Sequence, residues 1–493
     1  MQAAFNARCC VHALSASTMI IVALSVAILL PVFCTAAEPI HIHMPITRRS
    51  ARLRTAEDYF SAAEWSRVRY GFSSGVNRTR MGGRATTDNL AVVNQQGDSS
   101  YFTTIEIGTP GQTFNVILDT GSSDLFVLDS SCRDCAGSTL FDSSKSSSFS
   151  QTGSQATEIT YGSGSVAGFV STDTVSMGTF SVSSQGFLLV EQLTQGLVDG
   201  SVSGLIGLAF QSLAETAAAP FWQALINNNQ LTSPEMAFQL TRSTSENDEP
   251  GGVFTLGGTN STLFSGDIEF HDLASSSTPT FWMISVSAVT VQGKSVDIST
   301  GDSALAAIDT GTTAIGGPTD DVNAIWAAVP GASAVRDASG FFQFPCTTTI
   351  NITLSFGGNA WPISSEDLNL GPVTQGSSMC VGAIFELTLG GNSGAGNPSW
   401  VIGDTFLKNV YSVFRQNPMS VGFAQLSSGS GSSTTSSSGA PSSASASLPH
   451  APPIPSSPSQ SGSPSTSSND GRSVMVPITF LLSFITSLLA AIL

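Results

Sequence analysis

Two short stretches of the sequence end an apolar run with an aspartate that small, hydrogen-bonding residues follow. The first reads VILDTGSS and carries Asp119, and the second reads AAIDTGTT and carries Asp309, 190 residues later. A carboxylate at the end of a buried strand is costly unless it is hydrogen-bonded or takes part in chemistry. Because the same arrangement occurs twice, we expect the two aspartates to act together.

Two carboxylates that face each other at close range could perform acid–base chemistry. They cannot both ionise cheaply and therefore share a proton, which makes one a base and its neighbour an acid at the same pH. One oxygen can then accept a proton from water while the partner protonates the carbonyl that the water attacks. Hydrolysis of an amide needs both actions at once, because water is a weak nucleophile and the amide a weak electrophile.

The residues that follow each aspartate fit this chemistry. Glycine lets the backbone approach a carboxylate closely and donate an N–H group. Hydroxyl groups can bond the outer carboxylate oxygens or connect the two loops. We expect this support from Thr120, Gly121 and Ser122 in the first stretch, and from Thr310, Gly311 and Thr312 in the second.

The body of the chain has the pattern of an all-β protein. Between residues 97 and 426, β-branched and aromatic runs such as YFTTIEI and FSVSSQGFLLV alternate with Gly, Ser, Asn and Pro. Helix candidates are few, and the best are residues 214–229 and 320–329. A body of about 330 residues is too large for one simple sandwich core. This length favours two lobes.

An internal repeat supports the two lobes. Each half carries one of the aspartate stretches and, later, an apolar segment ending in glycine: GLIGLAF at 204–210 and WVIGDTF at 400–406. Such a repeat suggests lobes related by a pseudo-twofold axis, with equivalent loops meeting at that axis. We therefore expect an all-β, bilobal fold with a central cleft, an N-terminal lobe over 89–268 and a C-terminal lobe over 269–426.

Charge is distributed unevenly along the chain, whose net charge is −17. Residues 38–90 hold nine arginines and five acidic residues, whereas residues 91–493 hold eight Lys plus Arg against thirty Asp plus Glu. A strongly acidic body repels phosphates, which argues against nucleic acid as a partner. A basic segment before an acidic body suggests an electrostatic cover that is later removed, and we assign this propeptide to 38–88.

The first 37 residues have the layout of a secretory signal peptide. Arg8 precedes the apolar stretch at 19–33, and the small residues CTAA follow at 34–37. A retained membrane anchor is the alternative, which the small residues disfavour. The chain is therefore expected to enter the secretory pathway and to act outside the cell.

The C-terminal region divides into two parts. Residues 427–473 are almost wholly Ser, Gly, Pro, Thr and Ala, a composition typical of a disordered stalk. Residues 474–493 form an apolar tail with no Lys or Arg after it. A polar stretch before a terminal apolar tail is the layout of a GPI-attachment signal, and a retained transmembrane anchor is the alternative. Either would tether the protein to the cell surface.

Cysteine usage fits an oxidising compartment. Three of the seven cysteines lie in the signal peptide, and Cys132, Cys135, Cys346 and Cys380 remain. Four cysteines allow three connectivities, of which the local pairs 132–135 and 346–380 are the simplest. The CRDC segment could instead be a redox motif, but no βαβ pattern surrounds it, so a structural bond is favoured.

Taken together, these motifs resemble those of the pepsin-type aspartic proteases, from about Tyr101 to Ala424. The resemblance implies that Asp119 and Asp309 are the catalytic pair. It implies that TYGSGSVAG at 160–168 is a substrate-covering flap, with Tyr161, Gly162 and Ser163 at its tip. It also implies the two local disulfides, a cleft that takes an extended peptide, an inhibitory propeptide, a monomer, and no metal or organic cofactor.

The sequence departs from this family pattern at two positions. Phe126 stands where many relatives carry a tryptophan whose N–H reaches the flap tyrosine, so Tyr161 must bond elsewhere or close more loosely. Ser163 stands where some fungal relatives carry an aspartate that favours a basic residue before the cut. We therefore expect a preference for bulky apolar side chains flanking the cut.

Other readings of the sequence are weaker. His271 is the sole histidine between residues 91 and 426, and no nucleophile motif accompanies it, which disfavours a Ser-His-Asp triad or a histidine zinc site. A catalytically silent binding module on the same fold is the alternative function, but both aspartates and Tyr161 are intact. Asn260 and Asn351 begin glycosylation sequons.

Overall fold

The computed structural model describes residues 42–48, 55–72, 100–133, 135, 137–161, 164–194, 197–198, 201–242, 249–274, 278–389 and 397–427. The predicted signal peptide, the predicted stalk beyond its first residue and the apolar tail lie outside these described residues. Two parts of the predicted propeptide, 42–48 and 55–72, lie within them.

Within the described residues, the strands form one sheet of thirteen and three smaller sheets. The large sheet runs in the order β11 (Phe264–Asp272), β26 (Met419–Leu426), β25 (Val410–Gln416), β9 (Glu235–Leu240), β10 (Glu249–Leu256), β1 (Ile42–Arg48), β2 (Tyr101–Ile107), β3 (Gln112–Asp119), β8 (Gly204–Gly207), β4 (Leu125–Leu128), β7 (Phe180–Leu193), β6 (Gly164–Met177) and β5 (Ser150–Tyr161).

The smaller sheets come from the second half of the chain. Their orders are β12 (Met283–Ser285), β15 (Leu305–Ile308), β24 (Trp400–Ile402), β16 (Ile315–Gly317) and β23 (Ile384–Glu386); β14 (Lys294–Val296), β13 (Ala288–Val291), β19 (Ile352–Ser355) and β20 (Trp361–Ile363); and β17 (Ser333–Ala334), β18 (Phe342–Pro345), β22 (Met379–Gly382) and β21 (Asn369–Pro372). The all-β, bilobal fold class expected from the sequence is confirmed.

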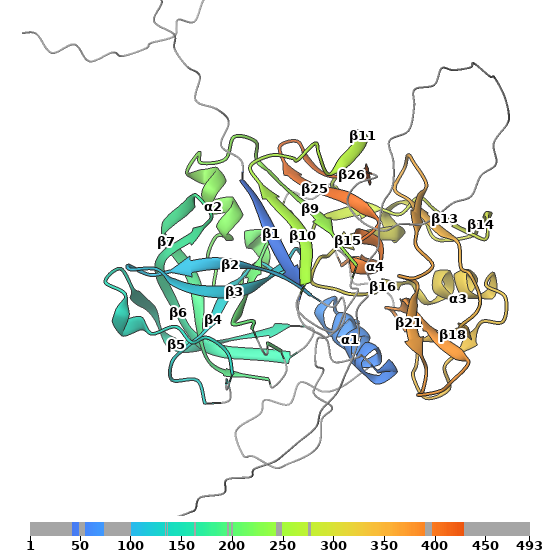
Figure 1. Ribbon diagram of the computed structural model, residues 1–493, viewed down its shortest axis with the longest axis horizontal. Coiled ribbons are helices and arrows are strands. Elements are labelled where there is room, and N and C mark those ends of the chain that lie inside the picture. Colours follow the sequence, from blue (N-terminus) through green and yellow to red (C-terminus); the bar gives the residue numbers. More distant parts are fainter. Residues whose placement is uncertain are drawn as a thin grey trace, which may run out of the picture. The chain divides into compact units, whose positions relative to one another are not determined.

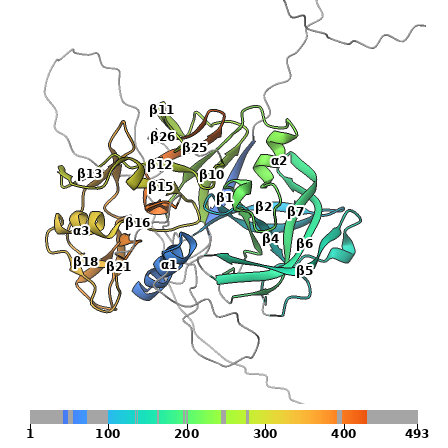
Figure 2. The same ribbon diagram turned by 180° about the vertical axis from the view of Figure 1, so that it is seen from behind.

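The two halves of the chain, which Figures 1 and 2 show from opposite sides, repeat one local arrangement of strands. In the first half, β8 lies parallel to β3 and antiparallel to β4, and β4 pairs in parallel with β7. In the second half, β24 lies parallel to β15 and antiparallel to β16, and β16 pairs in parallel with β23. The GLIGLAF and WVIGDTF segments thus supply equivalent strands, β8 and β24.

Helices are short and few among the described residues, and none has both the length and the apolar character needed to cross a bilayer. The α-helices are α1 (Ala56–Arg69), α2 (Phe221–Asn227), α3 (Thr319–Ala327) and α4 (Asp404–Leu407). The helix expected over 214–229 is shorter than predicted, because Pro220 occupies the N-cap position of α2 and the residues before it form turns. The helix expected over 320–329 is confirmed as α3, and α1 and α4 were not predicted.

Two elements of the predicted propeptide, a strand and a helix, pack within the fold. Strand β1 pairs antiparallel with β10 and, at its end, with β2, so it lies inside the large sheet. Helix α1 contacts both β5 and β21, and both views place it between the strands of the two halves (Figures 1 and 2). Its first turn begins at Thr55, whose amide and hydroxyl both donate to the Asp58 carboxylate, at 2.7 and 2.9 Å.

The core reaches directly under the loops that hold the two aspartates. The rings of Phe210 and Trp282 lie 4.5 Å apart between centroids, and Trp282 lies 5.4 Å from Trp222. Burial of each such side chain stabilises the fold by about 1.5–3 kcal/mol. The Trp282 indole N–H donates to the carbonyl of Leu208 at 2.9 Å, and the Leu208 amide donates to the carbonyl of Asp119 at 2.8 Å. Core packing therefore fixes the position of the first aspartate loop.

Candidate active site

The two aspartates occupy equivalent ends of equivalent strands. Asp119 is the last residue of β3, and Asp309 directly follows β15. Both are fully buried, at 0% exposure. The Asp309 amide donates to the carbonyl of Ile402 in β24 at 3.0 Å. In the first half, the amide of Leu208, the residue after β8, donates to the carbonyl of Asp119 at 2.8 Å. The apolar segments recognised in the sequence are therefore the strands that position both carboxylates.

The two loops are joined by reciprocal hydrogen bonds of two threonines. The Thr120 hydroxyl donates to the carbonyl of Ile308 and accepts from the Thr310 amide, both at 2.9 Å. The Thr310 hydroxyl donates to the carbonyl of Leu118 at 2.9 Å and accepts from the Thr120 amide at 3.1 Å. All four bonds are buried, so the distance between the loops is tightly defined.

Each carboxylate accepts a matched pair of hydrogen bonds from its own loop. Asp119 accepts from the Gly121 amide at 2.9 Å and from the Ser122 hydroxyl at 2.6 Å. Asp309 accepts from the Gly311 amide at 2.8 Å and from the Thr312 hydroxyl at 2.6 Å. These donors stabilise a charged carboxylate in a buried site and fix the orientation of its plane. The structure thus brings together all eight residues that the sequence placed around this pair.

The glycines are required because each loop lies against the opposite carboxylate. A Cβ at position 121 would lie 2.5 Å from the carboxyl carbon of Asp309. A Cβ at position 311 would lie 2.2 Å from an oxygen of Asp119. No side chain fits at either position without moving a carboxylate. The two carboxylates therefore share one small space.

A basic side chain from the predicted propeptide, Arg69, occupies that space. One guanidinium nitrogen of Arg69 donates to Asp119 at 2.8 Å, and the other lies 3.3 Å from Asp119 and 3.1 Å from Asp309. The Tyr70 hydroxyl donates to Asp309 at 2.8 Å, and its ring packs on Phe281 at 5.1 Å. The sequence indicated a basic propeptide over the cleft, but not which of nine arginines would reach the aspartates.

The pKa values of the two buried aspartates are shifted in opposite directions. Burial, reinforced by Asp309, raises the pKa of Asp119 above its usual range, although Arg69 opposes this. For Asp309 the same burial is outweighed by Arg69 and by the hydrogen bonds of its neighbours, so its pKa falls below the usual value. Burial would lower the pKa of Arg69, but the two carboxylates raise it instead. With Arg69 in place, Asp119 therefore binds a proton more readily than Asp309, and Asp309 is more readily ionised.

The segment predicted as the flap is a hairpin of β5 and β6, in which Tyr161 pairs with Gly164. Gly162 and Ser163, predicted for the flap tip, lie outside the described residues. Tyr161 packs its ring against Phe126 at 5.4 Å between centroids and is almost fully buried. Within the described part of the chain its hydroxyl has no hydrogen-bond partner. Phe126 supplies an apolar contact to the flap tyrosine and no donor.

A pocket next to the aspartates lies between the flap side of the N-terminal lobe and α1. Its apolar lining includes Ile117, Phe126, Leu197 and Val198, and its polar lining includes Asp119. This wall is suited to an apolar side chain beside the carboxylates.

The remaining predicted residues lie away from this site. Disulfides join Cys132 to Cys135 and Cys346 to Cys380, so the local pairing is confirmed. Of the two sequon asparagines, residue 260 is half-buried and residue 351 is exposed on the surface.

Comparison with known proteins identifies the family. The family model described as eukaryotic aspartyl protease matches residues 100–426. The chain is 40% identical to the major aspartyl peptidase 1 of Cryptococcus neoformans var. grubii. The match extends over 371 residues, which are 73% of this chain and 75% of that protein. It is 32% identical to an aspartic protease of Phaffia rhodozyma (78% and 91% covered) and 30% identical to human cathepsin D (68% and 82% covered). The chain therefore belongs to the eukaryotic aspartyl proteases, the pepsin-type family, and is an aspartic-type endopeptidase.

Proposed function

We propose that this chain is the precursor of a secreted acid endopeptidase in which Asp119 and Asp309 together activate water. The observation that carries this proposal is the pair of buried carboxylates. Each accepts a hydrogen bond from a glycine amide and from a hydroxyl group of its own loop, and both lie within reach of a single guanidinium. Arg69 is the cation that pairs with both carboxylates among the described residues, and once it leaves, the pair shares a proton. One carboxylate then accepts a proton from water while the other donates one to the peptide carbonyl.

The supporting residues keep this geometry during the reaction. The Thr120 and Thr310 bonds hold the loops together while charge moves between the carboxylates. In each carboxylate one oxygen accepts the hydroxyl of Ser122 or Thr312 and the other accepts the amide of Gly121 or Gly311, so both carboxylate planes stay fixed toward the bound water. Preorganised donors of this kind lower the cost of charge development in the transition state.

Substrate preference follows from the pocket beside the pair. Ile117, Phe126 and Leu197 offer an apolar wall to a side chain that lies beside the carboxylates. We propose that bulky apolar residues flank the cut bond and that Tyr161, with Gly162 and Ser163, closes over them as the flap. Burial of an apolar side chain in such a wall is worth about 1.5–3 kcal/mol.

The propeptide, residues 38–88, acts as an intramolecular inhibitor in this proposal. Arg69 and Tyr70 fill the position that water and the substrate carbonyl would take. Arginine keeps its charge at every physiological pH, so release depends on protonation of the carboxylates. Acid therefore favours opening of the precursor.

Location follows from sequence segments outside the described residues. We propose that 1–37 directs export, that 427–473 is a stalk, and that 474–493 is exchanged for a GPI anchor or retained as a membrane anchor. The mature lobes, 89–268 and 269–426, then work as a monomer outside the cell, with Asn260 and Asn351 as glycosylation sites. Peptides and unfolded proteins are its substrates, and no nucleic acid, metal or organic cofactor takes part.

The test is cleavage of an unfolded protein by the secreted form, compared with Asp119→Asn and Asp309→Asn. We expect cleavage in acid that a statine-type transition-state analogue blocks, and a loss of about 10²–10⁴-fold or more in each variant. Cleavage that survives in either variant would contradict the shared role of the pair. A folded, processed protein without activity would instead favour the silent binding module.

A further inference from the structure

A second propeptide arginine is buried in the protease body, away from the two aspartates. The Arg67 side chain is 1% exposed. Its Nε donates to the carbonyl of Glu386 at 2.9 Å, and one terminal nitrogen donates to the carbonyl of Ser339 at 3.1 Å. Its other terminal nitrogen pairs with Glu64 of the same helix. Two of the three nitrogens are thus bound by main-chain oxygens of the C-terminal half.

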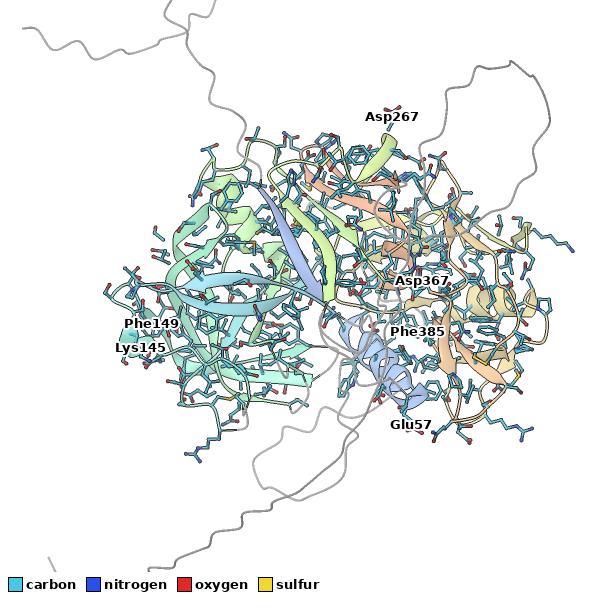
Figure 3. All side chains as sticks on the ribbon, in the orientation of Figure 1. Glu57, Lys145, Phe149, Asp267, Asp367 and Phe385 are labelled. Atoms are coloured by element: carbon cyan, nitrogen blue, oxygen red, sulfur yellow. A yellow bond between two sulfur atoms is a disulfide. The ribbon has the colours of Figure 1, made fainter. Side chains whose placement is uncertain are left out.

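The surroundings of this arginine are shaped for a planar cation. The guanidinium carbon lies 5.6 Å from the centre of the Phe385 ring, within the range of a cation–π contact. Gly340, at φ +78°, lies against one terminal nitrogen, and a Cβ there would come within 2.5 Å of it. Figure 3 labels Phe385 beside α1. We call Ser339, Gly340, Phe385 and Glu386 the guanidinium cradle.

The cradle belongs entirely to the mature part of the chain. When the propeptide leaves, Arg67 and Glu64 leave together, whereas the two carbonyls, the ring and the Glu386 carboxylate stay. Ser339 is exposed and Glu386 is half-buried even in the precursor, so both carbonyls become accessible to a new donor, and the Glu386 carboxylate adds a negative charge. The mature enzyme therefore keeps a site built for a positively charged, multidentate group and loses the group that filled it.

We propose that this cradle binds an arginine side chain of the peptide substrate and so adds a specificity site to the cleft. The inference rests on the proposed function, because it assumes that a substrate replaces the propeptide. Arginine suits the cradle better than lysine, because its flat fork can reach both carbonyls while lying over the ring. The arginine binds away from the cut bond, since Arg67 is separate from Arg69 and Tyr70, which occupy the aspartates.

The experiment uses the full chain after acid activation and a set of peptides derived from one cleaved parent without arginine. A single arginine, lysine or norleucine is placed in turn at each position on either side of the cut. Norleucine matches the apolar stem of the longer side chains and lacks their donors. We expect arginine to raise kcat/KM by about tenfold over norleucine at one position, through KM, with lysine in between.

Variants assign this preference to the cradle. The arginine-to-norleucine ratio of kcat/KM is compared within each variant, so that a general change in activity cancels. In Gly340→Ala the added Cβ occupies the guanidinium position, and the ratio should fall toward one. Glu386→Gln, which should fold readily, removes the charge and should lower the ratio severalfold. Glu106→Gln, an exposed change on β2, should leave the ratio as in the parent enzyme.

Three outcomes overturn the inference. If the norleucine peptide is cleaved and arginine is no better at any position, the cradle has no role in substrate binding, and the proposed acid protease function stands. If arginine is preferred equally in Gly340→Ala and Glu386→Gln, the preference arises elsewhere. If no peptide is cleaved by the activated, folded chain, both the inference and the proposed function fail.

Discussion

Replacement of Arg69 by glutamine should raise the fraction of open, active precursor without any processing of the chain. The side chain is 12% exposed and contacts two carboxylates that are fully buried. Its bonds measure 2.8 and 3.3 Å to Asp119 and 3.1 Å to Asp309. Glutamine is shorter and neutral, so it can replace neither the charge nor the contact with both residues.

The size of the effect follows from the cost of breaking a buried ion pair. Removal of one partner costs about 3–5 kcal/mol, because the remaining charges are left uncompensated. At 1.4 kcal/mol for each factor of ten, the fraction of open precursor should rise by roughly 10²-fold to a few 10³-fold. The Tyr70 bond and the apolar contacts of α1 remain, so the helix should still dock for most of the time.

The assay is the initial rate of cleavage of a quenched fluorescent peptide at about pH 5, where both aspartates of an open site can still share a proton. Gel analysis of the same samples establishes that the chain is intact during the measurement. Val68→Thr, a nearly isosteric change at the exposed position next to Arg69, is the matched control and should stay silent. An intact Arg69→Gln precursor as inactive as the parent would refute this account of inhibition.

Three further predictions follow from the same geometry. Gly311→Ala should lower kcat/KM by about 10²-fold, because its Cβ would displace the Asp119 carboxylate. Thr310→Val leaves a buried amide and a buried carbonyl unpaired and should reduce the free energy of unfolding by about 2–4 kcal/mol, measured in denaturant, whereas the exposed Thr104→Val should have little effect. Arg69 lowers the pKa of both carboxyls, so its departure from the site is coupled to proton uptake. Stopped-flow pH jumps should therefore show faster opening of the precursor as pH falls toward about 4. Opening that becomes faster with rising pH would contradict this.

The prediction from sequence was strongest where a short pattern has one physical meaning. An apolar run ending in Asp-Thr-Gly occurs twice, and each copy forms a strand end with its own donors, since the hydrogen bonds are made within three residues. The same holds for β2, whose YFTTIEI pattern forms the strand Tyr101–Ile107. The disulfides were also predictable, because pairing each cysteine with its neighbour along the chain is the simplest connectivity.

Prediction was weaker where a segment is ordered by its neighbours. Helix α1 was not predicted, because its apolar residues are scattered and its fixed position comes from the two lobes that enclose it. Its Thr55-to-Asp58 capping pattern is a signal that could have revealed its start. For α2 the reverse applied: helix-forming residues extend before Pro220, but the ring fixes the start at the following residue.

The sequence by itself thus determined the family, the all-β class and the two aspartates, because those features depend on residue types at fixed short spacings. Only the tertiary structure decided which arginines of the propeptide matter. Arg69 meets Asp309 across 240 residues and Arg67 meets Glu386 across 319, and such contacts depend on how the two lobes close around α1. Nine arginines look alike in the predicted propeptide sequence, and among the described residues the fold buries the side chains of Arg67 and Arg69 beside acceptors.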